Sequence, residues 1–228
     1  MEQKRFEGEF TVGSKASVGR FQFLTTWWQR GEFLSAMIVI HLLDHMVSDN
    51  LTKSNMLTPW GNEIVATFEL AGGFLLMVLA VASFIAIVRP FDKLIIPLVS
   101  VYLASAVAHL AVNVGAILIT AQVKRGETLI QLWDVVDVYF MGVFIFTVWY
   151  WFLDRITPGG AFIFSAQPDS QPVRRTLVDY LFLSFSTSAT FGPTTEPPTT
   201  RVAKVLMMIQ VCSSLVVLMV LLARALSG

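Results

Sequence analysis

The chain has 228 residues, of which 55% are hydrophobic and only 14% are charged. A soluble domain carries about 25% charged residues, so this composition excludes an ordinary soluble protein and predicts an integral membrane protein. Sixteen basic residues balance sixteen acidic ones, so the overall charge gives no indication of a nucleic-acid partner. The single cysteine, Cys212, excludes a disulfide framework within the chain.

The first apolar segment of the chain that is considered as a helix, FLSAMIVIHLLDHMV, lies at 33–47. It contains His41, Asp44 and His45. It is short for a helix that crosses a bilayer, which takes about 20 apolar residues, and it suits a helix that lies at the interface. The tryptophans at positions 27, 28 and 60 flank it, and Trp prefers the headgroup region. We therefore expect residues 1–62 to form a cytosolic N-terminus with an interfacial helix.

His41 and His45 are four residues apart and share one helix face, with Asp44 beside them. This spacing can bind zinc, but a zinc site needs a third or fourth ligand, and His109 is the only other histidine. Three interpretations remain open: a metal site, which would make the chain a metal-dependent membrane enzyme, a pH-sensing cluster, and a structural interfacial helix. We favour the structural helix.

Four later segments are long and apolar enough to span a membrane, and they lie at 64–88, 94–121, 133–153 and 205–223. The polar breaks RPFDK and VKRGE, and a stretch rich in Pro and Gly at 158–172, separate them. The expected fold is all-α, with four transmembrane helices. The helices within 63–122 are expected to be peripheral.

Three acids lie within or at the start of these spans. Glu69 is costly in lipid and should face protein or water, with His109 or Asn113 as a packing partner favoured over a proton relay. Asp134 and Asp137 begin the third span, where acids are stabilised by the helix dipole.

The segment LVDYLFLSFSTSA at 177–189 is apolar but too short to span, and the loop TFGPTTEPPTT follows it at 190–200. Non-helical backbone survives at membrane depth only where protein or a water-filled cavity shields it. A short apolar helix that runs into a loop of hydroxyl, Gly and Pro residues therefore predicts a re-entrant element.

The order of an outer span, a short aromatic helix, a hydroxyl–glycine loop and an inner span resembles the pore module of tetrameric potassium-type channels. The resemblance covers 133–226 and is carried by the segments DYLFLSFSTSATFG and PPTTRVAKVLMMIQ. These segments are similar to those of bacterial pore-loop ion-channel proteins. It implies a multi-pass homotetramer in the cell membrane that conducts potassium or sodium ions. It implies no cofactor, no catalytic residue and no metal ligand.

The resemblance aligns Thr190, Phe191, Gly192, Pro193 and Thr194 with the potassium filter Thr-Val-Gly-Tyr-Gly, whose carbonyl oxygens replace the hydration shell of the ion. Pro193 fixes its own φ and lacks an N–H, and the β-branched Thr194 disfavours the positive φ that glycine provides. Weak discrimination between potassium and sodium is therefore expected. The alternative is a non-conducting or regulatory member of the same fold.

Other pore residues follow from their positions. Glu196 comes just after the filter, and four copies would form an acidic ring at the outer mouth, whereas the alternative is a solvated loop acid. Gln210, Ser213 and Ser214 are polar residues in an otherwise aliphatic span, and Gln210 and Ser214 share one face. That face would line the cavity, and the alternative is packing between helices.

A filter that enters from outside places both termini in the cytoplasm if there are four spans. Nine basic residues then lie inside and seven outside, a modest positive-inside bias. If 33–47 also crosses the membrane, the same filter orientation leaves four inside and twelve outside. The count therefore favours four spans.

Overall fold

The computed structural model describes residues 27–53, 59–85, 92–121, 128–164, 175–190 and 196–227. These residues form six helices and no strand: α1 (Trp27–Lys53), α2 (Pro59–Ile85), α3 (Asp92–Ala121), α4 (Thr128–Ile156), α5 (Leu177–Thr190) and α6 (Arg201–Ser227). Five of these helices are long and apolar enough to cross a membrane, and α5 is not. The described chain is therefore all-α and has the apolar helices of a membrane-embedded protein.

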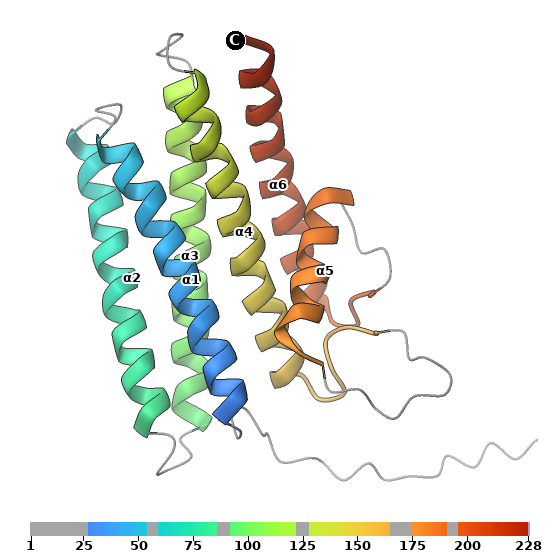
Figure 1. Cartoon of the computed structure of the whole chain (residues 1–228). Helices are drawn as coiled ribbons and strands as arrows, with labels where there is room; N and C mark the ends of the chain where they lie inside the picture. Colours follow the sequence, from blue (N-terminus) through green and yellow to red (C-terminus); the bar gives the residue numbers. More distant parts are fainter. Residues whose placement is uncertain are drawn as a thin grey trace, which may run out of the picture.

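The five long helices run side by side, and α5 lies beside α4 and α6 at one end of the bundle (Figure 1). The central helix is α4, which packs against α1, α3, α5 and α6. Of its apolar stretch Val135–Ile156, 61% is buried inside the bundle. The buried side chains include the aromatic residues Tyr150, Trp151 and Phe152, which contact neighbouring helices on several sides. The span of α2 is only 11% buried, which places this helix at the edge of the bundle.

The first helix differs from the sequence expectation. It has 27 residues, because polar residues on both sides of 33–47 continue the helix, and its apolar stretch Gly31–Asp49 has the length of a span. It lies along the bundle (Figure 1), and Phe33, Met37 and Ile40 bury one face against neighbouring helices. A helix lying flat at the interface would have no such protein surface to bury this face. Five helices, rather than the expected four, have the properties of spans.

Helix α1 begins and α6 ends at opposite ends of the bundle (Figure 1). If all five long helices cross a membrane, these two helix ends lie on opposite sides of it. The expectation of two cytoplasmic termini therefore does not follow from this architecture.

The chain leaves the bundle at the end of α4 and returns to it at the same end before α6 (Figure 1). An isolated antiparallel bridge joins Phe162 to Pro198, and the N–H of Ile163 donates to the carbonyl of Pro197 at 3.0 Å. Between these two points the 14-residue α5 runs back alongside α4 and α6. Its length is about 21 Å, against about 30 Å for the hydrocarbon core of a bilayer.

Candidate functional site

The predicted filter begins where α5 ends. Thr190 is the last residue of the helix, and Phe191, Gly192, Pro193 and Thr194 lie outside the described residues. The half-buried Glu196 is the first residue of the next described segment. The ion-coordinating geometry of the filter therefore stays a prediction. The structure shows the contacts that position α5, the helix that precedes the filter.

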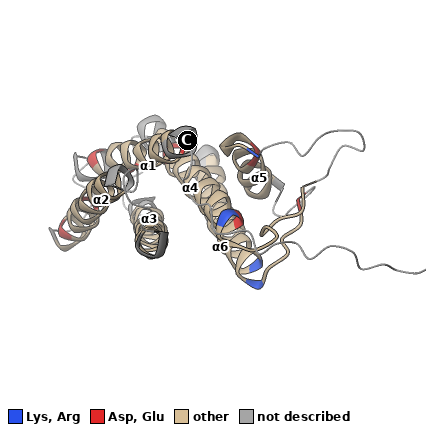
Figure 2. Ribbon diagram, turned by 90° about the horizontal axis from the view of Figure 1, so that it is seen from below, with Lys and Arg blue, Asp and Glu red and all other residues tan. Residues whose placement is uncertain are grey.

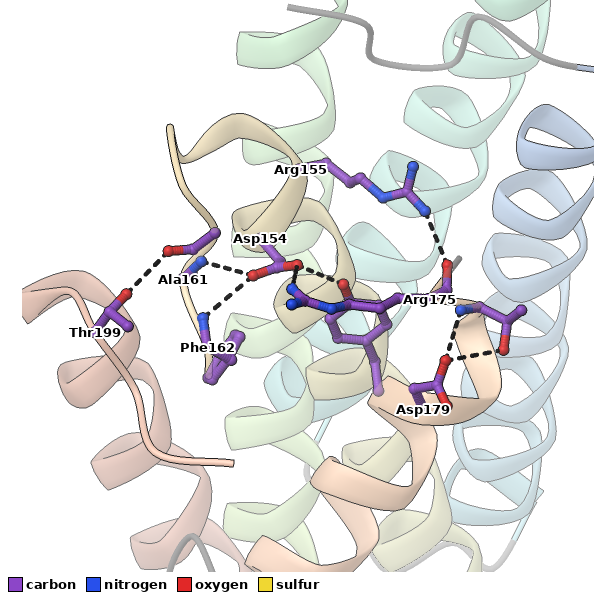
Figure 3. A network of polar contacts seen from close by, with 10 residues as sticks. Asp154, Arg155, Ala161, Phe162, Arg175, Asp179 and Thr199 are labelled. Atoms are coloured by element: carbon purple, nitrogen blue, oxygen red, sulfur yellow. Dashed lines mark hydrogen bonds and ion pairs between the residues drawn. The ribbon is translucent and has the colours of Figure 1, made fainter. Parts of the chain in front are cut away.

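Asp154, near the C-terminal end of α4, holds the start of α5 (Figure 3). Its carboxylate is 6% exposed and accepts four hydrogen bonds, from the backbone N–H groups of Ala161 (2.6 Å) and Phe162 (3.2 Å), from Arg175 (3.1 Å) and from the hydroxyl of Tyr180 (2.6 Å). A negative charge at this end of a helix opposes the helix dipole, so these donors are needed to stabilise it. Burial, followed by the hydrogen bond to Asp154, raises the pKa of Tyr180, which keeps its hydroxyl as a neutral donor.

The turn after α4 is shaped to admit this carboxylate. Gly160 has a φ of 86°, and a Cβ at this position would lie 3.0 Å from Oδ1 of Asp154. Any other residue would therefore combine backbone strain with a collision. The carbonyl of Gly160 also accepts a hydrogen bond from the hydroxyl of Thr199 at 3.0 Å, which ties the turn to the segment that enters α6.

The N-terminus of α5 has its own polar contacts. Asp179 accepts hydrogen bonds from the backbone N–H (2.7 Å) and the hydroxyl (3.2 Å) of Thr176, a capping interaction that fixes where the helix begins. Arg155 donates to the carbonyl of Arg175 at 3.1 Å, and the guanidinium of Arg175 lies 4.5 Å from the ring centre of Phe164. These contacts connect α5 to the end of α4 on two sides of Asp154.

Gln210 of α6 holds the second half of α5. Its side chain is buried, and its amide nitrogen donates to the carbonyl (2.9 Å) and hydroxyl (2.8 Å) of Ser184 and to the hydroxyl of Ser188 (2.7 Å). The hydroxyl of Tyr150 donates to the amide oxygen of Gln210, and the hydroxyl of Ser184 donates to the carbonyl of Val143 at 2.7 Å. One buried amide therefore joins α4, α5 and α6.

Of the three residues predicted to line a cavity, Gln210 and Ser214 are buried, and the hydroxyl of Ser213 donates to the carbonyl of Ile209 in the same helix at 2.9 Å. The burial of Gln210 and Ser214 in the single chain agrees with packing between helices, and a cavity-lining role for the three residues stays a prediction. The exposed stripe of α6 is instead apolar and comprises Val205, Met208, Cys212, Val216, Met219 and Leu222.

The acidic and histidine side chains of α1 to α3 form two separate pairs. The carboxylate of Asp44 lies 2.8 Å from Nδ1 of His109, both side chains are at most 9% exposed, and the amide of Asn113 donates weakly to Asp44 at 3.4 Å. The more exposed His45 pairs with Glu69 across α1 and α2. The expectation that Glu69 packs against His109 or Asn113 is therefore wrong.

Within the described residues, no group of three or more His, Cys, Asp or Glu side chains is placed to hold a metal ion. Asp44 and His45 are neighbours on α1 but lie in different surroundings, because Asp44 is buried and His45 is 60% exposed. The structure therefore lends no support to the zinc interpretation of this segment.

Helix α4 begins at Thr128, several residues before the predicted start at 133. Asp134 and Asp137 consequently lie in the second and third turns, beyond the first turn in which the helix dipole acts. The dipole explanation for these acids is therefore wrong. The side chain of Asp137 is half-buried in the bundle.

The sequence reasoning missed Asp154, Ser184 and Ser188. The signal for Asp154 was an acid in the last turn of an apolar span, where the dipole disfavours it, followed by two consecutive glycines. The signal for the serines was a four-residue spacing on one face of an otherwise apolar helix.

Comparison with protein-family models, with characterised proteins and with solved structures yields no match. The function therefore has to be argued from the apolar helices and from the way in which α5 is held between α4 and α6.

Proposed function

We propose that the chain is one subunit of a homotetrameric pore-loop cation channel, with α4 as outer helix, α5 as pore helix and α6 as inner helix. The supporting observation is α5, a helix too short to span a membrane, which starts beside the end of α4. Asp154 forms hydrogen bonds at its beginning, and Gln210 forms hydrogen bonds with its second half. A surface helix would not need buried polar contacts at both halves. The proposal requires no cofactor and no catalytic residue.

The permeant ions are monovalent cations, potassium and sodium. In the proposed filter the carbonyls of Thr190 and Gly192 retain one site of the potassium-channel kind. Pro193 and Thr194 cannot readily supply the remaining sites, because proline has a fixed φ and threonine disfavours a positive one. Weak discrimination between potassium and sodium follows.

Four copies are needed because one pore module supplies a quarter of a conduit. The apolar side chains that α5 and α6 expose in the single chain, including Phe182, Phe185, Met208 and Met219, would contact neighbouring subunits or lipid. A non-conducting member of the same fold is the main alternative, since Pro193 and Thr194 depart from a standard filter.

The orientation follows from the positive-inside rule applied to five spans. Among the described residues, two basic positions, Lys53 and Arg224, lie toward the end of the bundle where α1 ends. Six lie toward the α5 end: Arg30, Lys93, Arg155, Arg175, Arg201 and Lys204. Figure 2 views the bundle from the α5 end and shows the basic positions on and beside the start of α6. We therefore place the α5 end on the cytoplasmic side, so that Glu196 lies at the inner mouth and not at the outer mouth expected from the sequence.

A cysteine at position 196 tests conduction and orientation together. In a Cys212→Ser background, Glu196→Cys is expected to conduct cations in membrane vesicles and to be blocked by a positively charged, membrane-impermeant thiol reagent. The block is expected only in vesicles whose cytoplasmic face points outward, because the four thiols would surround the mouth on that side.

The matched control is Leu226→Cys in the same background, an exposed position at the opposite end of α6. Vesicles of either orientation should keep their flux, because this side chain lies away from the mouth. Insensitivity of Glu196→Cys from both sides would remove residue 196 from the conduction path. Block only from the extracytoplasmic side would show that the proposed orientation is inverted.

A further inference from the structure

An ionisable pair lies inside the apolar stretches of α1 and α3 that are long enough to span a membrane. Asp44 belongs to the apolar stretch Gly31–Asp49 and His109 to Ile95–Ala116. Their side chains are 9% and 3% exposed, and Nδ1 of His109 lies 2.8 Å from Oδ2 of Asp44. Ionisable residues are expensive at membrane depth, so a buried pair of this kind indicates a functional site.

A small cavity with both polar and apolar walls adjoins the pair. It has a volume of about 20 Å³, and its polar lining comes from His41, Asp44, Tyr102, Ser105 and His109. A cavity of roughly 10–15 Å³ on this measure is enough to hold one water molecule, provided that polar partners surround it.

Two adjacent glycines of α2 keep this space open. Gly72 lines the cavity, and a Cβ at this position would meet no atom within 4 Å. A Cβ at Gly73 would lie 3.4 Å from the ring of His41, so the absence of a side chain lets α2 approach this histidine closely.

The ring of His109 has one nitrogen in use and one that lacks a partner. Nδ1 faces Asp44, whereas the buried Nε2 has no hydrogen-bond partner among the residues that the structure describes. The ring stacks on Phe68 at 5.4 Å between centres. When Nδ1 carries the hydrogen toward the carboxylate, Nε2 is an acceptor. A buried acceptor without a partner is unfavourable, and a proton bound at this nitrogen would remove that cost.

We propose that Asp44 and His109 form a proton-binding site within the bundle. A hydronium ion supplies the proton that Nε2 of His109 binds: an O–H bond breaks and leaves a water molecule, and an N–H bond forms. The product is an imidazolium ion whose charge is balanced by the Asp44 carboxylate. The half-buried His41 lines the same cavity.

The surroundings of the pair contain few competing charges. Besides His41, α1 presents His45, which is engaged with Glu69 of α2 on the exposed side. From α3, the hydroxyl of Tyr102 donates to the carbonyl of Met37 at 3.4 Å, and Asn113 contacts Asp44. Helix α4 contributes the uncharged Met141 to the cavity wall. Asp44 is therefore the acid that balances a charge on His109.

Nitrogen-15 NMR of the full chain, labelled at histidine, tests the site without reference to conduction. The chain has three histidines, so the ring signals can be assigned by single substitutions. His109 is expected to show the tautomer with hydrogen on Nδ1 at high pH and an imidazolium signal when its ring has taken up a proton. His109→Gln should remove these signals.

Two variants separate the pair from the cavity. Asp44→Asn should abolish both the Nδ1 tautomer preference and the imidazolium signal at a pH where the wild type shows it. Gly72→Val keeps both titratable groups, should preserve the tautomer preference, and should suppress proton uptake by filling the cavity. His45→Gln is the matched control and should leave the His109 signals unchanged.

The proposal would be overturned by a His109 ring that stays neutral down to the lowest pH at which the protein is folded, or by unaltered proton uptake in Gly72→Val. An Asp44→Asn protein whose His109 titrates as in the wild type would also contradict it. If Asp44→Asn does not fold, the Gly72→Val spectrum decides the matter, because that variant leaves the ion pair intact.

Discussion

Replacement of Asp154 by Ala is expected to lower the free energy of unfolding in detergent by about 2–4 kcal/mol. Removing one partner of a buried ion pair costs about 3–5 kcal/mol, and Arg175 is 40% exposed, so water recovers part of this loss. The backbone N–H groups of Ala161 and Phe162 and the hydroxyl of Tyr180 lose their acceptor as well. Chemical unfolding followed by tryptophan fluorescence measures the difference.

Asp179→Ala is the matched control for this prediction. Asp179 lies in the first turn of α5, which is the end of the helix that Asp154 of α4 contacts. Its replacement removes only the capping contacts with Thr176, so the free energy of unfolding is expected to fall by about 1 kcal/mol. Asp154→Asn should fall between the two, because its remaining carbonyl oxygen can still accept from Ala161 and Phe162. Equal stability of Asp154→Ala and Asp179→Ala would show that Asp154 does not organise the start of α5.

Gln210→Leu is expected to be the most damaging single change to conduction. Leucine fits the apolar face of α6 but leaves Ser184, Ser188 and Tyr150 without their shared partner in a buried setting. Each buried polar group without a partner costs about 1–3 kcal/mol, so we expect about 2–4 kcal/mol of destabilisation after relaxation. Cation flux should also fall, because the amide of Gln210 holds the second half of α5, which ends at Thr190, in position.

Ser213→Ala is the control for Gln210→Leu. Its hydroxyl donates to the carbonyl of Ile209 within α6, so its loss should change stability by no more than about 0.5 kcal/mol and leave cation flux unchanged. Unfolding and liposome flux are measured on both variants. If Ser213→Ala reduces flux and Gln210→Leu does not, the polar face of α6 lines the conduit and does not hold α5.

The short helix α5 could be predicted from sequence because its length and its flanking loop are local properties. The status of α1 could not, because His41, Asp44 and His45 lower its hydropathy to 1.2 over Gly31–Asp49. Those side chains are accommodated by contacts with α2 and α3, and such contacts leave no mark on the pattern of a single segment.

The same limit applies to the candidate site. Gln210 could be selected as a polar residue in an aliphatic span, but its partners lie 22 and 26 residues earlier on another helix. Nothing in the local spacing distinguishes an amide that faces a conduit from one that fastens a neighbouring helix. Only the packing of α5 against α6 decides between these two roles.

The central claim is that four copies of this chain surround a path for monovalent cations. Its most direct test is ion flux through the purified oligomer, selected for a mass of about four chains and placed in liposomes with opposing potassium and sodium gradients. We expect flux of both ions with a reversal potential that indicates weak discrimination between them. A protein that purifies as a clean monomer, or a tetramer that passes neither ion, would contradict the account.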